Sequence, residues 1–186
     1  MNFIEFAHLL SNKPLVKQAF TQLHSHPQIN SNLLLYALWY GVNQRGRLFQ
    51  PDIKTLIESI QPWHERILLA LKRLPPHPPF IQGELATEIN IAEQFEWQLI
   101  SSSLLKFNFQ NRSLKQQLHD TCYNIMNYCK AIRILINEKD HSAIILLLQA
   151  AFPNVLISKI IQACETIVHP ETEKNRNFSQ LSLNEF

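Results

Sequence analysis

Apolar residues recur at helical spacing through the second half of the chain, and this pattern constrains the fold more than any other feature. Between residues 114 and 136 the intervals are 4, 4, 3, 4, 3 and 4 residues, the period of one face of an α-helix. The stripe consists of Leu114, Leu118, Cys122, Ile125, Cys129, Ile132 and Ile136. No segment has the alternating period of paired strands. The sequence therefore predicts an all-α fold.

The low glycine content excludes several function classes. The chain has 3 glycines against 10 prolines. Phosphate-binding loops, dinucleotide-binding turns and arrays of β-hairpins all need backbone positions with positive φ, which glycine supplies at least cost. We therefore expect none of these elements.

Capping residues mark where further helices begin. An almost wholly apolar run follows Asn30-Ser31-Asn32, and it predicts a central buried helix, since each of these three side chains can accept a hydrogen bond from an N-terminal backbone N–H. Ser113 is expected to cap the helix that carries the long stripe. Asp140 or Ser142 is expected to cap a helix over residues 143–152.

The length and the prolines indicate the domain organisation. A chain of 186 residues is the size of one domain. Pro62 is expected to end or kink the helix that Asp52 caps or opens, and residues 75–79 to form a stiff proline-rich spacer. From residue 169 the composition changes to Pro, Glu, Asn, Ser and Lys. We predict a single-domain bundle of seven or eight helices over 1–168 and a disordered tail over 169–186.

Charge and hydropathy argue against nucleic acid and membrane partners. Lys and Arg number 17 against 15 Asp and Glu, a net charge of +2, which is too balanced for a dedicated nucleic-acid binder. The longest apolar runs, 33–42 and 143–152, are half of what a membrane span needs. Glu5 and His8 interrupt any apolar segment at the N-terminus, so we expect no signal peptide.

The cysteines indicate a reducing compartment. Cys122 and Cys129 are seven residues apart on one predicted helix, which separates them by about 10 Å along its axis. That distance is too long for a disulfide. Together with Cys164 they are expected to be core thiols of a cytoplasmic protein.

An acidic segment is the first candidate for chemistry. Glu84, Glu88, Glu93 and Glu96 fall within thirteen residues, without a Lys or Arg among them. Glu84 and Glu88 share a helical stripe with Ala92, Phe95 and Leu99, so we expect them to point toward neighbouring helices. Like charges four residues apart repel unless a positive group lies nearby. These glutamates are therefore interpreted either as a metal or acid/base site or as members of interhelical salt bridges.

Two arginines are the natural partners of these carboxylates. Arg66 and Arg73 are seven residues apart and thus on one helix face. We predict that they pair with Glu84 and Glu88 across the proline spacer. The alternative is an anion site formed by both arginines and Lys72, because guanidinium groups suit carboxylate or phosphate.

Several common cofactor and metal motifs are absent. The helices that carry His64 and His119 lack the Glu-x-x-His spacing of di-metal bundles, and the sequence has no Cys-x-x-Cys, Walker-type loop or Gly-x-Ser-x-Gly. We therefore predict no cofactor, no metal and no catalytic nucleophile.

A polar and aromatic set is the candidate interface. Asn32, Tyr36, Trp39 and Trp63 lie within helical patterns, where they are expected as core residues or as the walls of a groove for a partner. The second interpretation rests on the large share that Trp and Tyr have in interface energetics.

Four segments of the chain have a recognisable pattern. They are Asn32-Leu33-Leu34-Leu35-Tyr36-Ala37-Leu38-Trp39, Pro62-Trp63-His64-Glu65-Arg66, Glu84-Leu85-Ala86-Thr87-Glu88 and the Asn-x-x-x-Tyr of residues 124–128. In these segments the chain resembles an uncharacterised proteobacterial family of small helical proteins, a domain of unknown function. The resemblance covers roughly residues 3–152. It implies a helical bacterial protein and no catalytic activity.

Two function classes follow from these patterns. The first is a non-catalytic interaction or adaptor protein with an unknown protein partner, favoured because no nucleophile, metal or cofactor motif is present. The second is a helical enzyme or small-molecule carrier that uses Glu84 and Glu88 as acid/base groups or metal ligands, with Arg66 and Arg73 as an anion clamp. A pocket into which the two glutamates converge would favour the second class, and a flat exposed patch around an aromatic side chain would favour the first. The pattern does not predict an oligomeric state.

Overall fold

The computed structural model describes residues 1–23, 25–75, 79–103 and 110–168, and these residues form helices and no strand. The elements are α1 (Phe3–Ser11), α2 (Pro14–Leu23), α3 (Ser31–Val42), α4 (Gln50–Trp63), the π-helical turn η1 (His64–Leu68), α5 (Leu69–Lys72), α6 (Pro79–Ser102), α7 (Leu114–Ala131), α8 (Glu138–Ala151) and α9 (Ile157–Val168). Since α4, η1 and α5 run on without a break, the described part has eight helices. The predicted all-α class is confirmed. The predicted tail over 169–186 lies outside the described residues.

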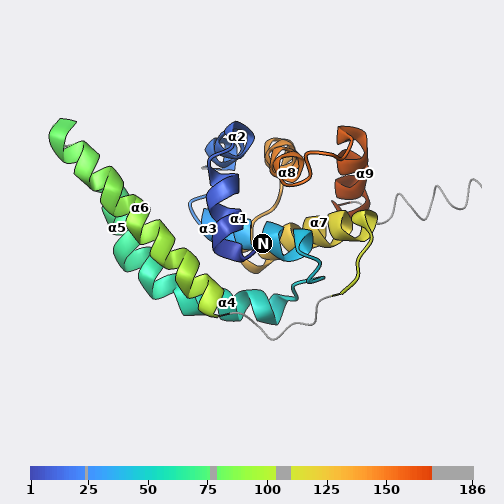
Figure 1. The fold of residues 1–186 in the computed structure, drawn as a ribbon, viewed down its shortest axis with the longest axis horizontal. Helices are drawn as coiled ribbons and strands as arrows, with labels where there is room; N and C mark the ends of the chain where they lie inside the picture. Colours follow the sequence, from blue (N-terminus) through green and yellow to red (C-terminus); the bar gives the residue numbers. More distant parts are fainter. Residues whose placement is uncertain (24, 76–78, 104–109, 169–186) are drawn as a thin grey trace, which may run out of the picture.

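The helix α3 is the centre of the fold, as its apolar sequence predicts. Its residues from 32 to 41 are all buried. The helices α1, α6 and α7 contact it, while α2 packs on α8 and α9 packs on α7 (Figure 1). The long stripe of α7 is part of the same core, with Leu118, Cys122, Ile125 and Cys129 buried.

Two helices begin at the expected caps, a third begins at a different cap, and α7 ends earlier than its apolar stripe. Asn30 caps α3 and Ser113 caps α7, as predicted. The cap of α8 is Asn137, because Asp140 occupies the third helical position and completes a capping box. The helix α7 ends before the stripe does, because the chain turns at Arg133 with a φ of 59°.

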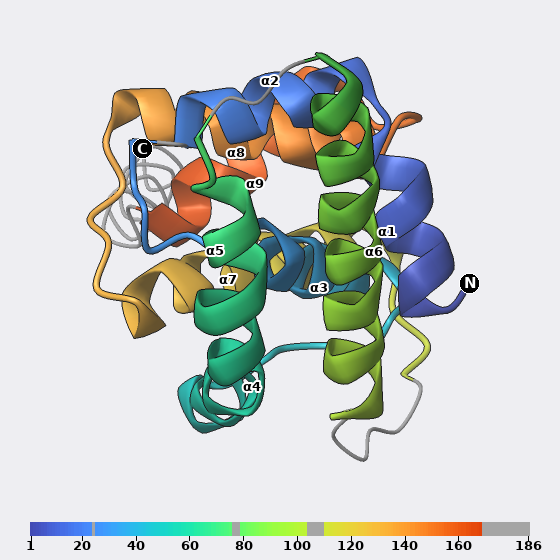
Figure 2. The ribbon, with the colours of Figure 1, turned by 90° about the vertical axis from the view of Figure 1, so that its left-hand side faces the viewer.

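Pro62 does not end its helix, but the predicted bend is present, because α4 and α5 run in different directions in Figures 1 and 2. Proline removes one backbone donor and its ring presses on the carbonyl four residues earlier. The helix accommodates it by widening into η1, where the N–H of Leu69 donates to the carbonyl of His64, five residues earlier. Asp52 lies at the third helical position of α4 and bonds back to the N–H of Phe49, so the helix begins at Gln50.

The continuous α4–η1–α5 helix and α6 form an antiparallel helical arm. Figure 2 shows α5 and α6 side by side, and Figure 1 shows the pair extending away from α2, α8 and α9. The Nζ of Lys72 lies 2.7 Å from a carboxylate oxygen of Glu93. This ion pair joins the C-terminal end of α5 to α6. None of the helices in the described ranges is both long and apolar enough to cross a membrane.

Candidate functional site

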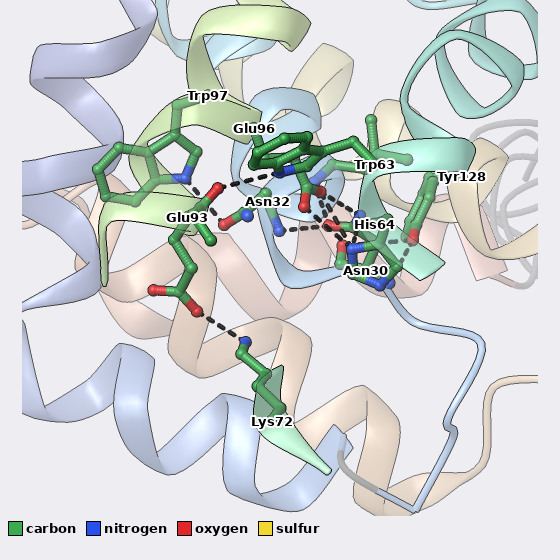
Figure 3. A network of polar contacts seen from close by, with 11 residues as sticks. Asn30, Asn32, Trp63, His64, Lys72, Glu93, Glu96, Trp97 and Tyr128 are labelled. Carbon is green, nitrogen blue, oxygen red and sulfur yellow. Dashed lines mark hydrogen bonds and ion pairs between the residues drawn. The ribbon is translucent and has the colours of Figure 1, made fainter. Parts of the chain in front are cut away.

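Glu96, on the inner face of α6, is a carboxylate with no exposed surface. Its Oε1 accepts a short hydrogen bond from Nδ2 of Asn30, and its Oε1 and Oε2 lie 3.2 and 3.0 Å from Nδ1 of His64 (Figure 3). A buried charge is costly unless it is paired and hydrogen-bonded. Glu96 therefore depends on these two neighbours from other helices.

Local structure fixes both partners. Asn30 is the N-cap of α3, and its Oδ1 accepts from the backbone N–H groups of Asn32 and Leu33 at 2.8 and 3.1 Å. That arrangement turns Nδ2 toward Glu96. His64 is the first residue of η1, the turn that follows Pro62, so the widened backbone helps to set the direction of its ring.

A further layer of buried polar groups holds the cap in place. The hydroxyl of Tyr128 on α7 accepts from the N–H of Asn30 at 2.8 Å and lies 3.3 Å from its carbonyl. Burial raises the pKa of the Tyr128 hydroxyl. The indole Nε1 of Trp97 donates to Oδ1 of Asn32 at 2.8 Å. Side chains of α6 and α7 thus fix the start of α3, and with it the position of Asn30.

The imidazole of His64 has one occupied and one open nitrogen. Nδ1 is also 2.8 Å from Nδ2 of Asn30, whose other neighbour is Oε1 of Glu96. We therefore assign the Nδ1 proton to the carboxylate, which gives both Glu96 oxygens a donor. Nε2 has no hydrogen-bond partner among the described residues and is not one of the fully buried unpaired atoms. The side chain of His64 is 17% exposed, and it lines a cleft to which Nε2 is open.

This cleft has a volume of about 550 Å³ and lies between α4–η1–α5, the approach to α3 and α7. Its apolar wall consists of Leu33, Ile57, Ile60, Leu69 and Ile132, beside Pro27. Its polar groups include His64, Arg73 and Tyr128. An apolar hollow with a few convergent polar groups is the usual form of a small-molecule site.

The four predicted charged residues do not form the expected cluster. Arg66, Arg73, Glu84 and Glu88 are all exposed. No ion pair joins them within the described ranges. The predicted inward direction of the glutamates is wrong because the buried face of α6 is centred on Glu96, about a third of a turn from the stripe of Glu84 and Glu88.

The predicted interface residues divide between core and surface. Asn32, Tyr36 and Trp39 are buried at 4, 1 and 1% exposure, so they cannot contact a partner in this structure. Tyr36 and Trp39 pack around Phe3, with ring centroids 5.2 and 5.6 Å from it. Trp63 is half-buried, and its ring centroid lies 4.3 Å from that of Phe95. Of the four, Trp63 reaches the surface.

The His64–Glu96 pair was not predicted from the sequence. Glu96 was grouped with the other acidic residues of its segment. A usable signal was its spacing, since Ala92 and Ile100 lie four residues to either side and both are buried. A charged residue in the middle of a buried stripe predicts a paired carboxylate.

The three cysteines are buried and free, as predicted. The Sγ atoms of Cys122 on α7 and Cys164 on α9 are 3.7 Å apart. That hydrogen bond, together with burial, raises the pKa of Cys122, and burial raises the pKa of Cys129 to about 12. Such thiols are poor nucleophiles. Among the described side chains, no three His, Cys, Asp or Glu are placed to hold a metal ion.

No family model matches the chain, and neither a curated protein nor a solved structure matches it significantly. The resemblance to an uncharacterised proteobacterial family therefore stays a prediction.

Proposed function

We propose that this protein is a non-catalytic interaction module that binds a partner protein through the outer side of its helical arm. The observation that carries this proposal is an exposed apolar patch on the arm, which we call the arm face: Trp63, Ile67, Ile91 and Phe95. Ile91 and Phe95 are 54 and 42% exposed, and Ile67 is 39% exposed. The contact between the tilted rings of Phe95 and Trp63 joins the two helices of the arm.

The arm face continues into negative charge. At 100° per residue, Glu84, Glu88, Ile91 and Phe95 lie within one 60° sector of α6. All four are exposed, and neither glutamate forms an ion pair with another described residue. Apolar side chains one turn apart, followed by uncompensated carboxylates, fit an amphipathic partner helix that carries Lys or Arg beyond its apolar anchors.

Two further observations support this class of function. Glu84 and Glu88, the groups on which the enzyme alternative depends, are exposed to solvent. The exposed apolar side chains around Phe95 are a feature expected of an interaction module. The cytoplasmic location inferred from the sequence agrees with three free thiols.

Site-specific crosslinking in host cells tests the proposal. A photoreactive phenylalanine analogue at Ile91 should trap one partner protein, whereas the same analogue at Leu135, which is 91% exposed but lies outside the arm, should not. Once identified, the partner should bind the Ile91→Asp and Glu88→Lys variants at least tenfold more weakly than the wild type. Equal trapping from both positions, or unchanged affinity in both variants, would contradict the proposal. Dimerisation of this chain through Ile91 would contradict it as well.

A further inference from the structure

We propose that the cleft beside His64 binds a small amphipathic carboxylate, an apolar chain or ring that carries a single acidic group. The acid is held by the guanidinium of Arg73, and the apolar body lies against the aliphatic wall of the cleft, beside the ring of His64. This site is separate from the arm face, and neither proposal depends on the other.

The π-turn gives the cleft a continuous wall. The residues of this wall recur every four positions, at Ile57, Gln61, Glu65, Leu69 and Arg73. In a regular α-helix each step of four advances 40° around the axis, so four steps would carry Arg73 about 160° from Ile57. A π-turn has i→i+5 hydrogen bonds and rotates less per residue, which reverses part of this drift. The π-turn at 64–68 thus allows Ile57 and Arg73, the two ends of this series, to line the same cleft.

The hydrogen bonds around the cleft leave Arg73 available. The carboxylate of Glu65 accepts from Nε2 of Gln61 at 2.8 Å. Glu96 is occupied by Asn30 and His64 beneath the floor. Arg73 makes no ion pair with the described residues.

The charge balance selects a singly charged ligand. Arg73 and the N-terminal end of α3, where Asn30 lies, favour an anion. Glu65 at the wall and Glu96 below oppose a second negative charge, so a monoanionic carboxylate fits better than a phosphate dianion. The aliphatic wall of five Leu and Ile residues gives an apolar body a surface to cover.

Calorimetric titration of the full chain with octanoate and with 4-phenylbutyrate tests the proposal. At least one of these acids should bind saturably at one site, and octan-1-ol at least tenfold more weakly than octanoate. The variant Arg73→Gln should weaken carboxylate binding at least tenfold. Its matched control is Arg66→Gln, which removes an exposed arginine of η1 that does not line the cleft and should leave binding unchanged.

A spectroscopic readout places the ligand independently of any variant. In proton–nitrogen NMR spectra, the ring signals of His64 should move on addition of the bound acid, while those of the exposed His8 stay fixed. Binding of neither acid would overturn the proposal. Equal losses in the Arg73→Gln and Arg66→Gln variants, or a fixed His64 signal at saturation, would overturn it too. Arm-face crosslinking is unaffected by any of these results.

Discussion

The contact between α3 and α7 makes Gly41 the most sensitive small residue of the fold. A methyl group on Gly41 would lie 2.6 Å from Cα and 2.7 Å from the backbone N of Thr121, and closer still to its Oγ1. The side-chain oxygen could rotate away, but the two backbone atoms belong to a buried helix. We therefore expect Gly41→Ala to force α3 and α7 apart.

Two opposing effects decide the size of the change. Alanine favours a helix over glycine by about 1 kcal/mol. Overpacking a close-packed interior costs roughly 1–3 kcal/mol and sometimes more, because the displaced helix loses its other contacts. Here the displaced contacts include the bonds from Tyr128 to the cap of α3. The balance predicts a net loss of up to about 2 kcal/mol, or a fall in Tm of up to roughly 8 °C for a domain of this size.

The chain offers a matched control for this substitution. Gly83, on α6, has no atom within 4 Å of the position that a methyl group would take. Gly83→Ala therefore gains the helix propensity without a clash and should raise the free energy of unfolding by up to about 1 kcal/mol. Urea unfolding followed by circular dichroism measures both variants. If Gly41→Ala is as stable as Gly83→Ala, the close approach of the two helices is not as described.

Three further predictions concern buried polar groups. Asn124→Ala removes the acceptor, at 2.7 Å, of the N–H of Leu48 and should lower the free energy of unfolding by about 1–3 kcal/mol in urea titrations. Glu96→Ala leaves donors from His64 and from the α3 cap without a partner and should cost about 3 kcal/mol, whereas Glu96→Gln keeps an acceptor and should cost less; equal losses would contradict the assigned hydrogen bonds. Burial raises the pKa of the Cys129 thiol from 9.0 to about 12, so the unfolded chain ionises first and stability falls by about 1.4 kcal/mol per pH unit above pH 9. Unfolding titrations between pH 8 and 10.5 should therefore show the difference in free energy of unfolding between the wild type and Cys129→Ala narrowing at that rate above pH 9. A constant difference would refute the raised pKa of Cys129.

The helices could be predicted because their patterns are local. The period of apolar residues places α7, and the side chains of Asn30 and Ser113 determine where α3 and α7 begin. The errors arose where two local solutions compete. Asp140 resembles an N-cap, but it serves at the third position of a capping box whose cap is Asn137. Pro62 could have ended its helix, but packing of the arm against α6 favours a continuous helix with one wide turn.

The candidate site could be predicted only in part, because it depends on contacts between distant segments. Asn30, His64, Glu96 and Tyr128 come from four elements, and no spacing in the sequence relates them. Arg73 was proposed as an anion ligand, and the structure places it on the cleft, but not with Arg66. Glu84 and Glu88, which were expected to pair with Arg73, are exposed because α6 buries the face that carries Glu96.

Buried residues of the motifs that carry the family resemblance hold the segments around the cleft in place. Asn124 and Tyr128 are one turn apart on α7; Asn124 holds the segment before α4, and Tyr128 holds the cap of α3. Asn32 at the start of α3 is held by Trp97, the neighbour of Glu96. None of these side chains needs to touch a ligand in order to matter, since a shift of the α3 cap would move Nδ2 of Asn30 away from Glu96. The Asn-Leu-Leu-Leu and Asn-x-x-x-Tyr motifs are therefore best understood as the support of the His64–Glu96 pair, and the groups proposed to bind other molecules include Arg73 in the cleft and the side chains of the arm face, which lie outside these two motifs.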